Sequence, residues 1–338
     1  MSDRPVAKTR GAAPPSIRNI LRLGVGVAVV VLVVWLLAAN LDWQAVVEAL
    51  AEADYRWVGL GVAAILGTFL TRGRRWQALL YRDDVSLRSA VTALLVGQVI
   101  NTGLPVMRSG DVTRAVWANR HDAVGVTPAL GSIALEKLWD LIALCATGVV
   151  MLVMVPLPDW FVRSTWGVIL ISGLALVVLY LGLHWQRPLL DFTARVLQRL
   201  SGKLGRLAMP QLRQLVAALD AVRQPQASLW AGVWTMGTWA LGAAANWAVM
   251  RAFGVDSVLG ATFLLATSML GGAVVPTPGR VGVFEGICVA SLVLFGVDAS
   301  LALAIGLVLH VVVVGPSFVG AAILAVLNAT SDRSSASD

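Results

Sequence analysis

Several charged residues lie within or beside the strongly apolar runs of this 338-residue chain, namely Arg108, Asp111, Glu136, Lys137, Asp140, Arg280 and Glu285. A charge at mid-bilayer depth costs roughly 2.5–3.5 kcal/mol on insertion scales, so such residues are usually functional. A guanidinium group beside the exposed N-terminus of a helix suits a phosphate, because the guanidinium offers paired donors and the helix end is positive. Arg108 and Arg280 each stand close to such a predicted helix start. We therefore predict that they bind an anionic, phosphate-bearing group.

Two of these carboxylates lie on the helix predicted over 128–155. Glu136 and Asp140 are four residues apart and therefore share a face. Like charges on one face repel, so we expect each to meet a cation or to bind a proton, with Arg108 and Arg280 as partners. Two interpretations stay open: a network that exchanges a proton, with Glu285 as a second candidate, or structural salt bridges that lock the helices together.

Patterns for nucleotide, metal and covalent chemistry are absent from the sequence. There is no Walker A loop, no G-x-S-x-G turn and no Cys/His cluster, and His121, His184 and His310 match no metal-ligand spacing. We therefore predict no cofactor, no metal site and no catalytic residue.

The composition places these charges in a membrane protein. Hydrophobic residues make up 58% of the chain and charged residues 13%, with a mean hydropathy of +0.79, whereas soluble proteins carry about 25% charged residues. A soluble enzyme is therefore excluded. Apolar runs near 22–39, 57–71, 128–155, 164–184, 229–250 and 299–327 are each about long enough to cross ~30 Å of hydrocarbon. The predicted fold class is an all-α polytopic membrane protein with about six full spans.

The net charge of +7 is explained by topology. Basic residues gather from the N-terminus to Arg22 and in 72–88, 105–127 and 185–228, whereas 40–56 is mainly acidic. The positive-inside rule places the basic segments and both termini in the cytoplasm, and 40–56 outside. We predict a multi-pass protein of the plasma (inner) membrane, with no nucleic-acid partner.

Two shorter apolar stretches, 89–107 and 258–275, each run into a Pro/Gly-rich break. The segments on both sides of the first stretch are basic, so we predict a re-entrant hairpin over 89–121, and a second one over 258–297. An offset of 172 residues places Gly110 on Gly282, and long span, hairpin and long span follow in the same order twice. The predicted topology makes this an inverted repeat, in which two broken helices meet near the midplane and form the substrate site. Asp111 and Glu285 suit the first helical turn after each break.

These features divide the chain into five segments. They are a cytoplasmic tail (1–21), the first helix and first repeat (22–155), a connecting span with cytoplasmic amphipathic helices (156–228), the second repeat (229–327) and a second cytoplasmic tail (328–338).

Three motifs occur in order along the chain. They are Asn101-x-x-Leu104-Pro105-x-x-Arg108-x-Gly110-Asp111-x-x-Arg114, Leu135-Glu136-Lys137-x-x-Asp140 and Pro276-Thr277-Pro278-Gly279-x-x-Gly282-Val283-x-Glu285. Over roughly 20–328 the chain resembles the lysylphosphatidylglycerol synthetase transmembrane, or flippase-like, family of integral membrane proteins. The resemblance implies that Asn101, Gly110, Pro278 and Gly279 belong to the substrate site beside the two arginines. The family commonly has a glycine at the position of Arg280, which makes Arg108 the better candidate.

The resemblance also implies a membrane domain that moves lipids, or molecules linked to polyprenyl phosphate, between leaflets. The predicted function is therefore a flippase or transporter for an anionic lipid or a polyprenyl-phosphate carrier. One alternative is a membrane-embedded transferase on lipid-linked substrates, with Glu136 or Asp140 as the base. Another is an accessory subunit that partners enzymes of envelope synthesis.

Overall fold

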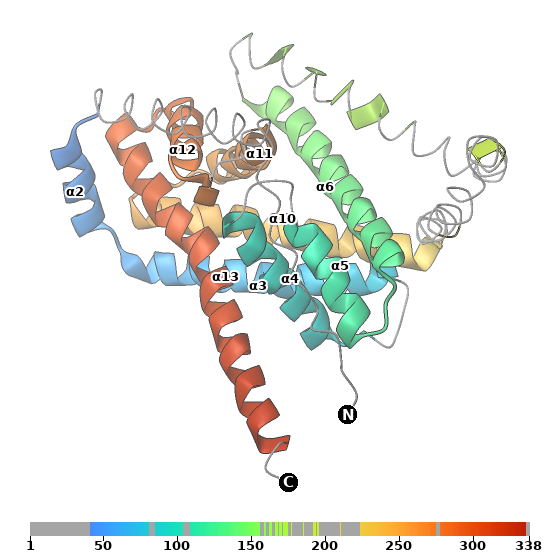
Figure 1. Ribbon diagram of the computed structural model, residues 1–338. Coiled ribbons are helices and arrows are strands. Elements are labelled where there is room, and N and C mark those ends of the chain that lie inside the picture. Colours follow the sequence, from blue (N-terminus) through green and yellow to red (C-terminus); the bar gives the residue numbers. More distant parts are fainter. Residues whose placement is uncertain are drawn as a thin grey trace, which may run out of the picture.

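The computed structural model describes residues 41–80, 85–103, 109–155, 224–274 and 278–335, and scattered positions between 159 and 210. Every element in this part of the chain is helical, as Figure 1 shows. The elements are α2 (Trp43–Glu52), α3 (Tyr55–Leu80), α4 (Leu87–Gly103), α5 (Ser109–His121), α6 (Val126–Met154), α10 (Pro225–Ala252), α11 (Val258–Val274), the 3-10 helix η3 (Pro278–Arg280), α12 (Val283–Val293) and α13 (Ala299–Ser335).

The all-α class is confirmed for these residues, whereas the count of about six spans is not. Within the described residues, α6 and the part of α13 over Ala299–Gly320 are long and apolar enough to cross a membrane. Helices α3 and α10 include the runs 57–71 and 229–250 but are longer, with 26 and 28 residues. The predicted span 22–39, the tail 1–21 and most of 156–223 lie outside the described residues. At the other end α13 continues to Ser335, past the predicted boundary at 327.

The two predicted hairpins are present as pairs of short helices. Helices α4 and α5 contain 17 and 13 residues, and α11 and α12 contain 17 and 11. At 1.5 Å per residue these helices are roughly 17–26 Å long, less than the ~30 Å of a hydrocarbon core. The two helices of each pair also pack against each other. Such short arms suit hairpins that turn back inside the membrane.

Glycines allow the arms of the first hairpin to touch through their backbones. A Cβ atom added to Gly110 at the start of α5 would lie 2.0 Å from the carbonyl oxygen of Gly97 on α4. The Asn101 side chain also accepts a hydrogen bond from the Gly110 backbone N–H at 2.9 Å. The two glycines therefore allow α4 and α5 to cross closely beside the first break. Residues 104–108 of that break lie outside the described part of the chain.

The helices α3 to α6 and α10 to α13 make the same set of pairwise contacts. In each set the successive helices touch, and the first helix also touches the last. Across the two sets, α4 contacts α13 as α11 contacts α6, and α3 contacts α13 as α10 contacts α6. The most extensive contact joins α3 to α10, which run side by side in opposite directions (Figure 1).

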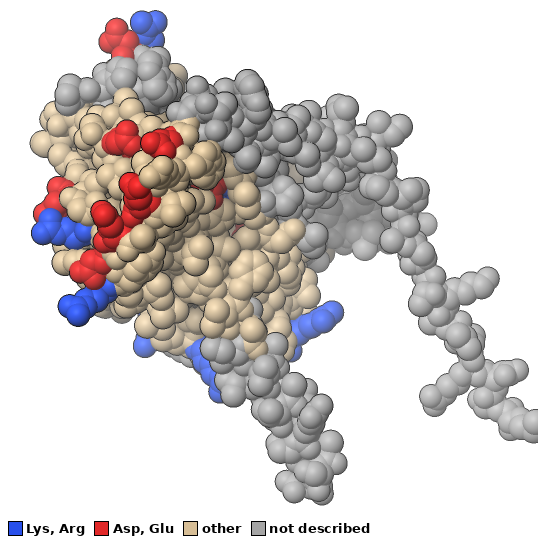
Figure 2. All heavy atoms as spheres, turned by 90° about the vertical axis from the view of Figure 1, so that its left-hand side faces the viewer, with Lys and Arg blue, Asp and Glu red and all other residues tan. Residues whose placement is uncertain are grey.

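One end of the bundle is acidic. The Asp54 backbone N–H before α3 donates to the Ala252 carbonyl oxygen at the end of α10 at 2.9 Å, and the Asp42 N–H before α2 donates to the Ser300 hydroxyl on α13 at 3.3 Å. Exposed carboxylates gather here, and Figure 2 shows this side of the molecule. We call the group Asp42, Glu48, Glu52, Asp54, Asp256 and Asp298 the acidic end; Arg56 and Arg251 lie among them.

The opposite end carries exposed arginines. Gln77 near the end of α3 donates to the Val85 carbonyl oxygen before α4 at 2.6 Å, and the Ser89 hydroxyl on α4 donates to Asp122 just after α5 at 2.5 Å. The exposed residues Arg74, Arg88 and Arg120, which we call the basic end, lie on these helix ends. Hairpin α4–α5 therefore has its open side, where α4 begins and α5 ends, at the basic end. Hairpin α11–α12 has its open side, where α11 begins and α12 ends, at the acidic end.

Candidate functional site

A buried group of charges joins α3, α5 and α6, and we call it the charge cluster. It consists of Arg72, Arg75, Arg114, Glu136 and Asp140. The side chains of Arg75, Arg114 and Glu136 are at most 3% exposed, whereas those of Arg72 and Asp140 are 23% and 30% exposed. The cluster is thus closed on one side and reachable on the other.

Arg75 connects both carboxylates of α6. Its Nη1 lies 2.6 Å from Oδ1 of Asp140, and its Nη2 lies 3.1 Å from Oε1 of Glu136. Nη1 also donates to the Thr235 hydroxyl of α10 at 3.2 Å. A single buried guanidinium therefore holds α3, α6 and α10 together.

Arg114 approaches Glu136 from the first hairpin. Its Nη1 donates to Oε2 of Glu136 at 2.7 Å, and its Cζ lies 3.8 Å from the ring centroid of Trp76, a cation–π contact. The Trp76 indole N–H in turn donates to the Ser132 hydroxyl at 2.8 Å. The Trp76 ring and the Glu136 carboxylate therefore hold the Arg114 guanidinium in position.

Donors remain unused in this cluster. Nε and Nη2 of Arg114, and Nε of Arg75, are buried without a hydrogen-bond partner among the described residues. A buried unsatisfied donor costs about 1–3 kcal/mol. The ion pairs also bring three guanidinium groups to two carboxylates. This arrangement suits an additional anion with several acceptor oxygens, of which phosphate is an example.

The structure brings together part of the predicted site. Glu136 and Asp140 share a face and meet cations as expected, but their described ion pairs are with Arg72, Arg75 and Arg114. Arg108 lies outside the described residues, so its role stays a prediction.

The described contacts of two further predicted residues lie within the first hairpin. The side-chain oxygen of Asn101 accepts a hydrogen bond from the Gly110 backbone N–H, and its role as a substrate ligand stays a prediction. Asp111 stands in the first turn of α5, as predicted.

Sequence reasoning missed Arg72 and Arg75 as site residues. The positive-inside rule places segment 72–88 in the cytoplasm, whereas α3 continues to Leu80 and buries Arg75 completely. A signal was available, because Arg72 and Arg75 are three residues apart and so share a helix face, as Glu136 and Asp140 do.

The second break is held by a different set of contacts. Gly279 and Arg280 in η3 have φ values of 64° and 59°, and the Gly282 that precedes α12 has a φ of 80°. Such values suit glycine and are uncommon for arginine. Pro278 begins η3, and the Arg280 side chain is exposed. The 3-10 helix also contacts α4 of the first hairpin, so elements of the two hairpins meet.

Glu285 connects this break to α13. Its Oε2 accepts the Gly282 backbone N–H at 2.7 Å, and its Oε1 lies 2.5 Å from Nδ1 of His310. Nε2 of His310 lies 2.9 Å from the Gly279 carbonyl oxygen. Sequence reasoning placed Glu285 correctly in the first turn of α12 but missed His310, although an ionisable residue inside an apolar span is itself a functional signal.

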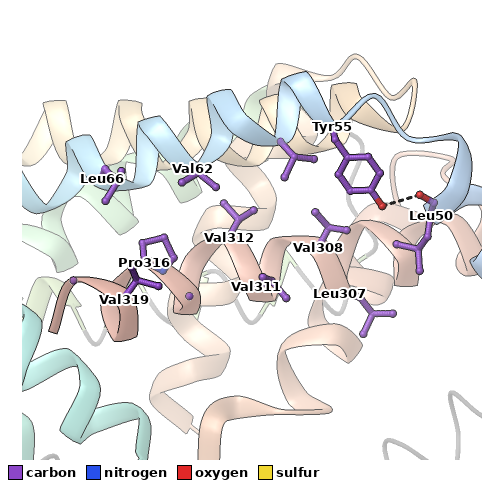
Figure 3. Close-up of a pocket in the computed structure, with 13 residues that line it drawn as sticks. Leu50, Tyr55, Val62, Leu66, Leu307, Val308, Val311, Val312, Pro316 and Val319 are labelled. Atoms are coloured by element: carbon purple, nitrogen blue, oxygen red, sulfur yellow. Dashed lines mark hydrogen bonds between the residues drawn. The ribbon is translucent and has the colours of Figure 1, made fainter. Parts of the chain in front are cut away.

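An apolar groove lies between α3 and α13. Its cavity measures about 750 Å³, and Figure 3 shows side chains such as Val62 and Leu66 of α3 across from Val308 and Val312 of α13. The lining is aliphatic except for Tyr55, whose hydroxyl donates to the Leu50 carbonyl oxygen at 2.7 Å. The groove therefore offers hydrocarbon contacts without a free polar group.

The described residues contain no group of three or more His, Cys, Asp or Glu side chains that could hold a metal ion. The candidate site consists of the charge cluster, the second break and the groove.

Comparison with known proteins agrees with the predicted family. The model of the lysylphosphatidylglycerol synthase TM region matches residues 23–320, a stretch that includes the charge cluster, both hairpins and the groove. No curated protein and no solved structure matches the chain significantly. Because the match covers most of the chain, this protein belongs to the family of the lysylphosphatidylglycerol synthase TM region, a family of membrane domains.

Proposed function

We propose that this protein moves an anionic lipid, or a lipid linked to polyprenyl phosphate, between the leaflets of the plasma membrane without itself being an enzyme. The observation that carries the proposal is the charge cluster with its unused donors. Nε and Nη2 of Arg114 are buried and have no hydrogen-bond partner in the described part of the chain, at an arginine that Trp76 and Glu136 already hold in place. A headgroup phosphate could accept from both nitrogens, because neighbouring guanidinium N–H groups match two oxygens of one phosphate.

The arrangement of the hairpins supports movement between leaflets. One hairpin opens at the acidic end and the other at the basic end, and η3 of the second contacts α4 of the first. Inverted repeats with broken helices that meet near the midplane are typical of alternating-access transporters. In this topology the acidic end faces outside, and the basic end and both chain termini face the cytoplasm.

The groove supports a substrate with long hydrocarbon chains. Its rim includes Val311 and Val319, which are 70% and 60% exposed and would face the bilayer. A lipid chain could remain in this groove while the charge cluster binds the headgroup. The charge cluster and the groove would then bind the two chemically different parts of one substrate.

Reconstitution into liposomes provides the test. The purified chain is reconstituted into vesicles that contain fluorescent phosphatidylglycerol, polyprenyl phosphate or phosphatidylcholine. A membrane-impermeant quencher removes the outer-leaflet fluorescence at once, and the later loss of fluorescence from inner-leaflet lipid reports the movement. We expect movement of the two anionic lipids and much slower movement of the zwitterionic one. Equal rates for all three lipids, or no movement of any, would contradict the proposal.

One substitution separates lipid binding from folding. Arg114→Lys keeps a cation beside Glu136 but removes the paired guanidinium donors, so we expect the protein to fold and to lose roughly tenfold in rate, the equivalent of about 1.4 kcal/mol. The matched control is Arg120→Lys, on the same helix but exposed at the basic end. Full activity of Arg114→Lys would show that a point charge suffices and that the unused donors bind nothing.

A further inference from the structure

The hydrogen bonds around His310 determine how many protons the site holds. A carbonyl oxygen only accepts, so the contact at 2.9 Å between Nε2 and the Gly279 oxygen requires a hydrogen on Nε2. A neutral imidazole has only one N–H, which leaves Nδ1 as an acceptor. Nδ1, however, lies 2.5 Å from Oε1 of Glu285. An ionised carboxylate is also only an acceptor, so these two atoms would repel each other.

The contact is therefore possible only with one additional proton. Either His310 is an imidazolium with hydrogens on both nitrogens, or the Glu285 carboxyl is protonated and donates to Nδ1. The other oxygen of Glu285 already accepts from the Gly282 N–H at 2.7 Å, which places the shared proton between Oε1 and Nδ1. In both cases the pair carries no net charge, as suits side chains that are only 7% and 15% exposed.

We infer that Glu285 and His310 form a proton-binding site that attaches the second break to α13. The proton holds Nδ1 and Oε1 together, and through them the Gly282 N–H and the Gly279 carbonyl. When the proton leaves to water, two acceptors face each other and the contact opens. The break then loses its link to α13 through Glu285 and keeps only the contact between Nε2 of His310 and the Gly279 carbonyl oxygen.

Among the described residues, few other titratable groups face this pair. Cys288 follows Glu285 by three residues on α12 and is completely buried, and Arg280 of the break is exposed. Helix α11 contains no charged residue, and the described charged residues of α2, α3, α4 and α10 belong to the acidic end, the basic end or the charge cluster. The Phe284 ring, with its centroid 5.2 Å from that of His310, covers the imidazole. The described contacts therefore assign the additional proton to the Glu285–His310 pair itself.

Glutamine at position 285 makes a sharp test variant. Its amide oxygen can accept from the Gly282 N–H while its NH2 group donates to Nδ1 of a neutral His310. Glu285→Gln thus keeps every contact but needs no additional proton. We expect this variant to fold and to lose the pH dependence of the contact.

The measurement is nitrogen NMR of the full chain in lipid nanodiscs with 15N-labelled histidine, where His310→Gln assigns the signal. The pH is varied from about 5 to about 9. At low pH we expect one of two signals: the NMR signal of doubly protonated His310, or an infrared band of a protonated carboxyl group that Glu285→Gln removes. We also expect the thermal midpoint of the wild type to fall by at least about 2 °C when this signal disappears, and that of Glu285→Gln to stay flat. His121→Gln and Glu48→Gln, both at exposed residues, serve as controls.

The inference fails if His310 is neutral and no carboxyl is protonated anywhere in this range while the fold stays intact. It also fails if Glu285→Gln keeps the same pH-dependent midpoint as the wild type. Proton binding is read without lipid movement, so the two proposals can be separated. A proton signal in a protein that moves no lipid would overturn the proposed function and leave the proton site standing.

Discussion

At the scale of single residues, each half of the molecule uses one buried acid–base pair to join its hairpin to its last helix. In the first half the base is Arg114 on α5 and the acid is Glu136 on α6. In the second half the acid is Glu285 on α12 and the base is His310 on α13. Under the offset of 172 residues that superposes Gly110 on Gly282, these pairs fall within two residues of each other. The sign of the charges is exchanged between the halves.

The exchange of charge sign assigns two roles, proton coupling and structural ion pairing, to different pairs. The sequence alone did not distinguish them. An arginine keeps its proton under all ordinary conditions, so the pair of Arg114 and Glu136 is a permanent ion pair. Histidine is the side chain suited to proton exchange near neutral pH. The coupling role predicted first for Glu136 therefore fits Glu285 better, and Glu136 fits the role of a structural and orienting anion.

We expect Glu136→Gln to destabilise the protein strongly. Removal of one partner from a buried ion pair costs about 3–5 kcal/mol, because the remaining charge is left uncompensated, and here Arg75 and Arg114 both lose a carboxylate. The thermal midpoint in detergent, compared with that of Glu48→Gln at the acidic end, provides the measurement. Equal midpoints for the two variants would mean that the ion pairs contribute little to stability.

At the scale of helices, the close crossing of α4 and α5 makes its own prediction. Gly110→Ala would place a methyl group 2.0 Å from the Gly97 carbonyl oxygen, so the two arms must separate. Forced overpacking of this kind costs about 1–3 kcal/mol. Gly103→Ala is the matched control, since a Cβ atom there meets nothing within 4 Å. We expect a lower midpoint and lower lipid movement only for Gly110→Ala, and unchanged behaviour of both variants would exclude a tight hairpin.

The groove between α3 and α13 can be filled by substitution. Val311→Trp would occupy its rim with an indole, whereas Val153→Trp adds the same ring to an equally exposed position of α6 outside the groove; the two valines are 70% and 74% exposed. If lipid chains bind in the groove, only Val311→Trp should slow the movement of long-chain lipids, by roughly tenfold or about 1.4 kcal/mol. The liposome assay measures this, and equal rates for the two variants would assign the chains to another surface.

The helices were more predictable from the sequence than their contacts. Apolar runs and Pro/Gly breaks are local signals, and they predicted α6, α10 and both hairpins, including Asp111 and Glu285 in first turns. The partners of Glu136 lie 61 and 22 residues away, at Arg75 and Arg114, and no local pattern specifies such a pairing. Because arginine next to an apolar run usually marks the membrane surface, the positive-inside rule pointed away from Arg75.

At the scale of the whole molecule, the two ends differ in charge and the two halves run in opposite directions. Helix α6 starts at the basic end, near the end of α5, whereas its counterpart α13 starts at the acidic end, beside α2. An inverted repeat requires this arrangement, because its second half enters the membrane from the other side. Each hairpin also touches the last helix of the other half, so movement at one break could be transmitted to the opposite half.

This arrangement makes a topological prediction with two single cysteines. In a background with Cys145→Ala and Cys288→Ala, a cysteine replaces either Gln44, exposed on α2 at the acidic end, or Arg120, exposed at the basic end. The positive-inside rule places the basic end in the cytoplasm. A membrane-impermeant maleimide should therefore label Gln44→Cys in intact cells, and Arg120→Cys only after the membrane is opened. Labelling of both positions in intact cells would rule out the proposed topology, because a hairpin that opens to the cytoplasm cannot expose residue 120 outside. Labelling of Arg120→Cys alone in intact cells would show that the orientation is inverted. The Glu285–His310 proton site would then belong to the half whose hairpin opens to the cytoplasm.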